Sequence, residues 1–165
     1  MGHEQRAVFE NNIGQLVDDI LIARMAGLNF LRITQRPVQS EVYDACDALG
    51  MMVQTDLPVF GAIRRSKAAA IVRQCEQMER LIRSHPSCIM VTFINEMMDV
   101  NQLETIGKTH RLLNREEMLD LFESCRHMVH LHNPDRVVKE IDGSFCPPNR
   151  YGMPDQHCYP GWYGN

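Results

Sequence analysis

The sequence has no long apolar run and little net charge. No stretch approaches the ~18 consecutive apolar residues of a membrane span, and Met1-Gly-His-Glu-Gln-Arg6 lacks the apolar core of a signal peptide. The net charge is −4, without a basic stripe or a block of like charge. We therefore expect no membrane and no nucleic acid as partner, and the composition favours the cytoplasm over an exported location.

The cysteines do not follow the pattern of a disulfide framework or a zinc site. No two of them form a CxxC pair, and several fall inside predicted helices or strands. His157 and Cys158 are neighbours, but on a strand they would point to opposite faces. We therefore expect a reducing compartment and no metal. The six cysteines are Cys46, Cys75, Cys88, Cys125, Cys146 and Cys158.

The hydrophobic pattern predicts alternating helices and strands in a single domain of 165 residues. Residues 1–12 are polar and unpatterned, and residues 97–114 form an irregular stretch of a length that is often functional. Strict alternation with one helix between successive strands indicates a parallel sheet. The predicted helices span 13–25, 41–49, 66–83 and 115–131, and the predicted strands span 30–34, 51–56, 88–93, 136–141 and 156–159.

Two parallel architectures fit this alternation. A doubly wound sheet should carry a glycine-rich phosphate turn after its first strand, where this chain has Thr34-Gln-Arg-Pro37. Since that turn has no glycine, we expect no nucleotide cofactor, and indeed no cofactor at all. Polar residues follow every predicted strand, as the catalytic face of a barrel requires. The sequence therefore predicts a partial (β/α)8 barrel, with roughly five of its eight strands present.

The stretch from Cys88 to Glu96 carries the strongest functional signal. Its mostly apolar run is typical of a strand buried on both faces, and polarity begins abruptly at Asn95 and Glu96. A carboxylate at the C-terminal end of a parallel strand lies where barrel enzymes keep catalytic groups, although it could also simply cap the next loop. Arg32 interrupts another apolar run, so it needs an acidic partner or faces a pocket.

Four segments together resemble the catalytic barrel of glycoside hydrolase family 2, which includes β-galactosidases, β-glucuronidases and β-mannosidases. The resemblance covers roughly residues 14–163. Two departures fall at substrate-shaping positions: Gln35 stands where many members carry His, and Thr55-Asp56 replaces an Asp-Glu pair. The matching segments are Asn29-Phe-Leu-Arg32 with Pro37, Val42 to Gly50, Arg83-Ser-His-Pro-Ser-Cys-Ile89 with Asn95-Glu96, and Asp155-Gln-His-Cys-Tyr159 with Trp162.

The resemblance implies a role for each matching residue. Glu96 matches the acid/base of a retaining glycosidase, and Asn95 matches the residue that binds the sugar 2-hydroxyl. Arg32 matches an arginine that orients the nucleophile. The residues that the resemblance places against a carbohydrate substrate are Arg32, Gln35, Asp56, His157, Tyr159 and Trp162.

The resemblance also implies a second carboxylate, about 5–5.5 Å from the first, on a later strand. Glu140 follows a strand but matches a non-catalytic part of the family, so we reject it as the nucleophile. We expect residues 1–165 to be an inactive fragment whose partners are the remaining strands and β-sandwich domains of a longer chain. Two alternatives stay open. One is a non-catalytic carbohydrate-binding or regulatory module. The other is an inverting hydrolase with Asp56 or Asp142 as base.

Overall fold

The computed structural model describes residues 3–98, 111–143 and 157. The elements alternate as the sequence predicts, and the helix at Ile13–Met25 has the predicted bounds. In chain order they are α1 (His3–Phe9), α2 (Ile13–Met25), β1 (Phe30–Ile33), α3 (Ser40–Leu49), β2 (Met52–Asp56), the 3-10 turn η1 (Arg65–Lys67), α4 (Ala68–Ile82), β3 (Cys88–Asn95), α6 (Arg115–His132) and β4 (Val137–Asp142).

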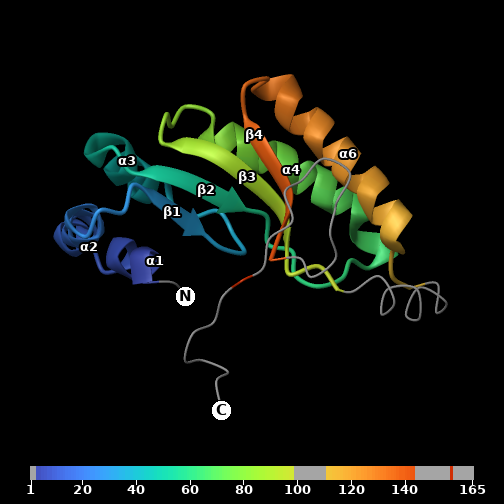
Figure 1. The fold of residues 1–165 in the computed structure, drawn as a ribbon, viewed down its shortest axis with the longest axis horizontal. Coiled ribbons are helices and arrows are strands. Elements are labelled where there is room, and N and C mark those ends of the chain that lie inside the picture. Colours follow the sequence, from blue (N-terminus) through green and yellow to red (C-terminus); the bar gives the residue numbers. More distant parts are fainter. Residues whose placement is uncertain (1–2, 99–110, 144–156, 158–165) are drawn as a thin grey trace, which may run out of the picture.

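The four strands form one parallel sheet in the order β1-β2-β3-β4. The prediction of a parallel sheet is therefore confirmed. Spatial order follows chain order without reversal, whereas doubly wound sheets reverse direction at a switch point. Because all strands run the same way, their C-terminal ends lie on one edge, which is visible in Figure 1 as the side toward which the arrows point.

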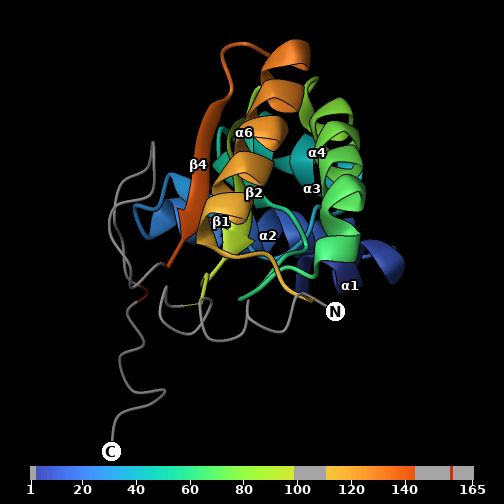
Figure 2. The ribbon, with the colours of Figure 1, turned by 90° about the vertical axis from the view of Figure 1, so that its right-hand side faces the viewer.

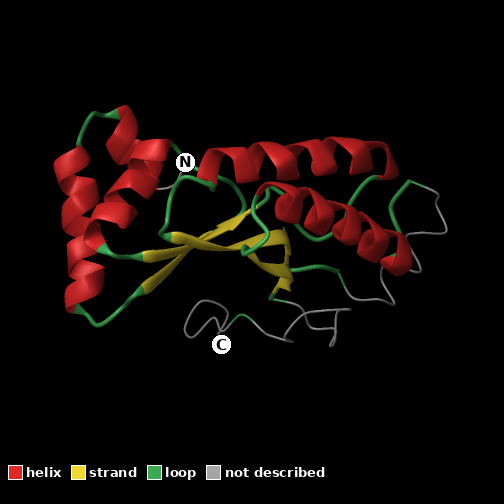
Figure 3. Cartoon of the chain, turned by 90° about the horizontal axis from the view of Figure 1, so that it is seen from above, coloured by secondary structure: helices red, strands yellow, loops and turns green. Residues whose placement is uncertain are grey.

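Helices gather on one face of the sheet. α4 and α6 contact each other and lie over that face, as Figures 2 and 3 show, while α1, α2 and α3 contact one another beside β1. Side chains alternate between the faces, as in any strand. Thr55 donates a hydrogen bond to the Tyr43 hydroxyl of α3 (3.3 Å), and Glu140 accepts one from Arg126 of α6 (3.1 Å). Glu140 therefore faces a helix.

Local sequence explains where the helices begin and end. Asn114 precedes α6, and its side chain accepts a hydrogen bond from the Glu117 backbone (2.9 Å) while Glu117 accepts one from the Asn114 backbone (2.9 Å). This capping box satisfies two N–H groups that a helix start leaves open. Gly50 follows α3 with a φ of 65°, the left-handed conformation that glycine adopts most easily.

Two sequence predictions change. Residues 1–12 are not wholly unpatterned, because α1 forms at His3–Phe9 and buries Ala7. A helix of two turns is too short to show periodicity, and its stability comes from packing against α2 and α3. The predicted strand at 156–159 lies outside the described residues except for His157, which is not in a strand. No helix in the described ranges has the length and apolarity to cross a membrane.

Candidate active site

A cluster of polar side chains occupies the C-terminal edge of the sheet. Arg32 extends from β1 and donates hydrogen bonds to both carboxylate oxygens of Asp56 at the end of β2 (Nη2–Oδ2 2.6 Å, Nε–Oδ1 3.3 Å). It also donates to Asn95 Oδ1 at the end of β3 (Nη2–Oδ1 2.6 Å). Arg32 therefore does find an acidic partner, and it joins three strands at the edge where barrel enzymes carry their chemistry.

Asp142, the last residue of β4, contacts four polar side chains of the cluster. Its Oδ2 accepts hydrogen bonds from Gln54 Nε2 (2.6 Å) and Lys139 Nζ (3.0 Å). Its Oδ1 lies 2.9 Å from Arg32 Nη1 and 2.7 Å from His157 Nε2. These partners come from β1, β2, β4 and the C-terminal segment, so Asp142 connects the whole edge.

The environment of Asp142 keeps it ionised. Burial disfavours the charged form, but hydrogen bonds from Gln54, His157 and Lys139 and the charge of Arg32 outweigh it. Together they lower the pKa of Asp142 from 3.8 to about 2. A carboxylate that stays ionised at every ordinary pH is a fixed negative charge rather than a proton donor.

Glu96 follows β3 with an unusual backbone conformation. Its φ is 49°, in the left-handed region, and its backbone N–H donates to the Asp142 carbonyl (2.7 Å). A non-glycine residue held there costs about 1–3 kcal/mol, and such strain is concentrated at functional sites. Gln35, another predicted site residue, has a φ of 64°, and its backbone N–H donates to Asp56 Oδ2 (3.2 Å).

His157 lies at the same edge of the sheet. Its Nδ1 lies 2.8 Å from Glu96 Oε1 and its Nε2 lies 2.7 Å from Asp142 Oδ1. The ring lies directly against Gly143, where a Cβ atom would come within 2.5 Å of the imidazole. Glu96, Arg32, Asp56 and His157 therefore lie together at the C-terminal edge of the sheet.

The loop after β2 forms one wall beside Asn95. Gly61 N–H donates to the Asn95 carbonyl (3.1 Å), and Asn95 N–H donates to the Val59 carbonyl (3.0 Å). Phe60 between them is 57% exposed. Phe60 borders a depression of about 430 Å³ that Arg64 and Lys67 also line.

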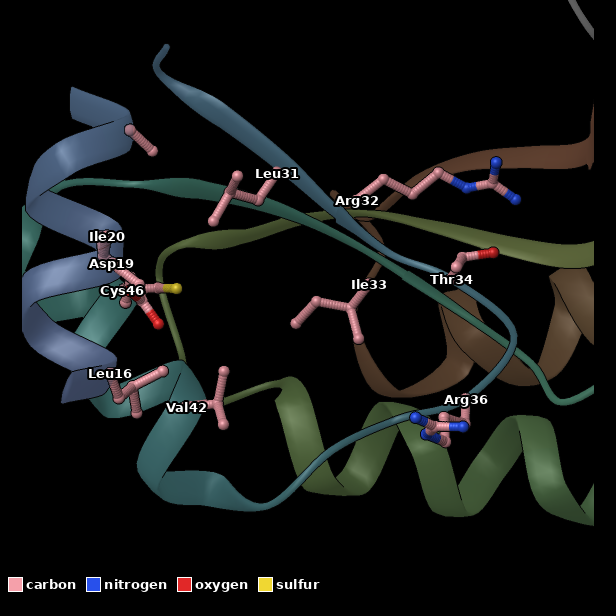
Figure 4. A pocket seen from close by; sticks show the side chains of 11 residues that line it. Leu16, Asp19, Ile20, Leu31, Arg32, Ile33, Thr34, Arg36, Val42 and Cys46 are labelled. Carbon is pink, nitrogen blue, oxygen red and sulfur yellow. The ribbon is translucent and has the colours of Figure 1, made fainter. Parts of the chain in front are cut away.

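A larger cavity of about 570 Å³ lies between β1 and the helices α2 and α3, and Arg32 is among the residues that line it. Its walls are mostly apolar and come from α2, α3 and β1, with Leu16, Ile33 and Val42 among them. Figure 4 shows Ile33 and Arg32 extending to opposite sides of β1. This cavity is a space between helices and an edge strand, so we assign it no part in the candidate active site.

The predicted site residues fall into two groups. Six of them meet at the C-terminal edge: Arg32, Gln35, Asp56, Asn95, Glu96 and His157. Tyr159 and Trp162 lie outside the described residues.

Two residues of the cluster, Gln54 and Lys139, were not predicted as site residues, and Asp142 was named only as a base in the inverting alternative. The sequence signal that could have indicated them was the polar end of β4. The following Gly143 makes that end equally typical of a simple turn.

Comparison with known proteins adds evidence about the fold. No protein-family model matches this chain, and neither does any curated protein. Solved structures of glycosidases do match. A β-glucuronidase from Bacteroides uniformis, covalently bound to cyclophellitol-6-carboxylate aziridine, superposes with a TM-score of 0.66 over 78% of this chain at 22% identity. The chain has the fold of part of a GH2-like enzyme.

Two further structures agree. An FMN-binding β-glucuronidase from Faecalibacterium prausnitzii L2-6 matches with a TM-score of 0.63 at 18% identity, and a GH2 β-galacturonidase from Eisenbergiella tayi, bound to galacturonate, with 0.58 at 16%. Both matches cover 78% of this chain, and they cover 18% and 22% of those proteins. For the B. uniformis enzyme the share is 16%, so the chain spans about one sixth of it.

Proposed function

We propose that this chain is the acid/base-bearing part of a partial (β/α)8 barrel in a longer retaining glycoside hydrolase. The observation that carries the proposal is the placement of Glu96. Its carboxyl group follows a buried parallel strand, on a left-handed backbone, next to Asn95 and within the polar cluster at the C-terminal edge. The parallel strand order without reversal and the likeness to GH2 glycosidases support the same architecture.

In this proposal Glu96 protonates the leaving oxygen while a nucleophilic carboxylate, supplied by another part of the longer enzyme, attacks the anomeric carbon. In the second step Glu96 takes a proton from the attacking water. Asn95 Oδ1 already accepts from Arg32, which directs the amide Nδ2–H groups of Asn95 toward a sugar hydroxyl. Arg32, held by Asp56, fixes that orientation. Tyr159 and Trp162 remain proposed contacts to the sugar.

Retention is favoured over inversion because neither candidate base is available to water. The Asp56 side chain is fully buried, and it accepts hydrogen bonds from Arg32 and Gln35. Asp142 is nearly as buried, and both of its oxygens are occupied. The covalent adduct of the B. uniformis enzyme with a cyclophellitol derivative is also what a nucleophilic mechanism produces.

The substrate class to test first is a β-linked uronide. The matching solved structures are β-glucuronidases and a β-galacturonidase, so aryl β-glucuronides and aryl β-galacturonides are the first choice. The chain of 165 residues alone should release no aryl alcohol from either, because the proposed nucleophile belongs to another part of the enzyme.

The deciding experiment is the Glu96→Gln variant of the longer enzyme. Loss of general acid catalysis should slow hydrolysis of substrates with poor leaving groups by about 10²–10⁴-fold. Activated aryl substrates need little protonation, so their first step should be nearly unaffected, and the glycosyl-enzyme should accumulate in a burst. Azide needs no deprotonation, so it should restore turnover and give a β-glycosyl azide.

The control is Glu41→Gln, which changes an exposed glutamate on α3 and should alter none of these rates. Equal losses on both kinds of leaving group, without an azide product, would show that Glu96 is not the acid/base. A product of inverted configuration would instead support the inverting alternative.

A further inference from the structure

Glu96, His157 and Asp142 form a continuous chain of hydrogen bonds. Glu96 Oε1 lies 2.8 Å from Nδ1 of His157, and Nε2 of the same ring lies 2.7 Å from Asp142 Oδ1. The backbone joins Glu96 and Asp142 a second time, because Glu96 N–H donates to the Asp142 carbonyl (2.7 Å). The imidazole therefore bridges the two carboxyl groups, and the inference below rests on the proposed role of Glu96.

The surroundings hold the ring in one orientation. Gly143 leaves room for the imidazole, since a Cβ at this position would come within 2.5–2.6 Å of three ring atoms. Gln54 and Lys139 fix the other oxygen of Asp142. A carboxylate held from both sides presents Oδ1 to the ring at a fixed angle, which is how a buried aspartate selects the tautomer of a histidine.

The hydrogen-bond inventory decides which nitrogen carries a proton. Asp142 is ionised and can only accept, so Nε2 carries a hydrogen that it donates to Oδ1. Arg32 Nη1 can only donate and lies 2.8 Å from the same nitrogen, but it also lies 2.9 Å from Asp142 Oδ1, so its own hydrogen is directed to that oxygen. Nδ1 then faces Glu96, with which it shares one further proton. That proton lies on Nδ1 when Glu96 is ionised and on Oε1 when Glu96 is neutral.

Other charged groups face the ring as well. Arg32 Nη1 of β1 lies 2.8 Å from Nε2 and opposes a positive imidazole, while Asp56 of β2 and Lys139 of β4 act through Arg32 and Asp142. Burial lowers the pKa of His157, but the hydrogen bonds to Asp142 and Glu96 outweigh burial and Arg32, so the net shift is upward from 6.5.

We propose that Asp142 is a positioning residue for the acid/base. It holds a proton on His157 Nε2, and thereby keeps Nδ1 and a shared proton facing Glu96. During the first step, as the glycosidic C–O bond breaks, Glu96 gives its proton to the leaving oxygen and becomes a carboxylate. His157 Nδ1 remains beside that carboxylate through the second step, when Glu96 recovers a proton from water. Asp142 contacts neither the sugar nor the reacting atoms.

The first test is an NMR titration of the histidine rings in the 165-residue chain, with the His157 signals assigned by loss in His157→Gln. In the unchanged chain, His157 should titrate above pH 6.5 and be the Nε2–H tautomer once neutral. Asp142→Asn should lower its midpoint by about one pH unit or more. The matched control is Asp47→Asn, because Asp47 Oδ2 pairs with His85 Nδ1 at the same distance, 2.7 Å, and lies on α3.

Asp47→Asn should alter the signals of His85 and leave those of His157 unchanged. An unchanged His157 midpoint in Asp142→Asn would overturn the proposal. If Asp142→Asn does not fold, the unchanged chain still tests the proposal. A neutral His157 in the Nδ1–H tautomer would overturn the proposal equally.

The second test is the pH profile of kcat/KM in the longer enzyme. Asp142→Asn should move the alkaline limb to lower pH, and Asp47→Asn should not. A limb that stays in place overturns the proposal. This outcome is separable from failure of the proposed function: if the His157 titration behaves as expected but Glu96→Gln slows all substrates equally, the hydrogen-bond chain is correct and the assignment of Glu96 is wrong.

Discussion

At the scale of single residues, the candidate site depends on small steric and electrostatic details. Gly143 has a φ of 71°, a left-handed conformation that glycine adopts easily. It also lacks the Cβ atom that would overlap His157 at this position. Glu96 pairs with the ring that Gly143 admits. Removing the space beside Gly143 should therefore disturb the site without altering any charged group.

We predict that Gly143→Ala displaces His157 from Glu96 and Asp142. The added Cβ would meet the ring at 2.5 Å, and the left-handed backbone adds a cost of about 1 kcal/mol or more. The His157 midpoint in an NMR titration should fall toward its ordinary value. The control is Gly50→Ala, since Gly50 has a similar φ of 65° but no atom within 4 Å of the new Cβ. If both variants leave His157 unchanged, the close approach is not structurally important.

We also predict that Asp142 makes stability dependent on pH. Its folded pKa is lowered to about 2 from 3.8, so it stabilises the fold above pH 3.8 and loses that effect as the pH falls toward 2. The shift corresponds to about 2 kcal/mol. His157 has a raised pKa, so its protonated form stabilises the fold below pH 6.5. That stabilisation is lost as the pH rises above 6.5.

Urea unfolding at pH 5.5 and pH 2 measures the Asp142 effect. Asp142→Asn should lower the free energy of unfolding by about 2 kcal/mol at pH 5.5 and by much less at pH 2. A loss of equal size at both pH values would contradict the prediction, because a purely steric defect does not titrate.

At the scale of elements, a buried ion pair joins α4 to the entry of β4. Arg136 donates to Glu79 through Nε and Nη2 (3.1 and 3.0 Å), and both side chains are almost fully buried. Removing one member of such a pair leaves an uncompensated charge and costs about 3–5 kcal/mol. Replacing both members with apolar residues avoids that cost.

We therefore predict that Arg136→Met lowers the free energy of unfolding by about 3–5 kcal/mol and that Glu79→Leu/Arg136→Met recovers most of the loss. Chemical unfolding of the two single variants and the double variant measures the coupling. The surface pair Arg80–Glu76 on α4 is the comparison, and Arg80→Met should cost less than about 1 kcal/mol. A double variant as unstable as the single variants would mean that the pair specifies the packing of α4.

At the scale of the whole molecule, the sheet has exposed edges. β1 and β4 are the outer strands, and among the described residues neither has a partner strand on its outer side. All four residues of β1 are only partly buried, and the cavity beside it is lined by apolar side chains. Open strand edges pair readily with other chains. Exposed apolar residues on and after α2 add to this tendency, namely Ile22, Met25 and Leu28.

We predict that the 165-residue chain associates with itself, over roughly micromolar to millimolar concentrations. Sedimentation velocity at increasing concentration measures the association. Ile22→Lys/Met25→Lys separates the two causes, because it removes the apolar contribution of α2 and leaves the edge of β1 intact. A monodisperse monomer that melts cooperatively would contradict the idea of a fragment and favour a complete module.

The sequence by itself determined the elements and the location of the acid/base candidate. Helix and strand periodicities are local, and so are the signals at Gly50 and Asn114, which is why these bounds could be read from the chain. The same holds for Glu96, because a buried run that ends in a carboxylate is visible within nine residues. Among the described helices, α1 was missed, since its stability depends on distant packing.

The tertiary structure alone decided how the polar residues are paired. Arg32 and His157 are 125 positions apart, and Gln54 and Asp142 are 88 apart, yet both pairs are in contact. No periodicity reports such a distance, because strand order and register set it. The parallel sheet brings every strand end to one edge, where Asp142 and Gly143 come to hold the imidazole beside Glu96.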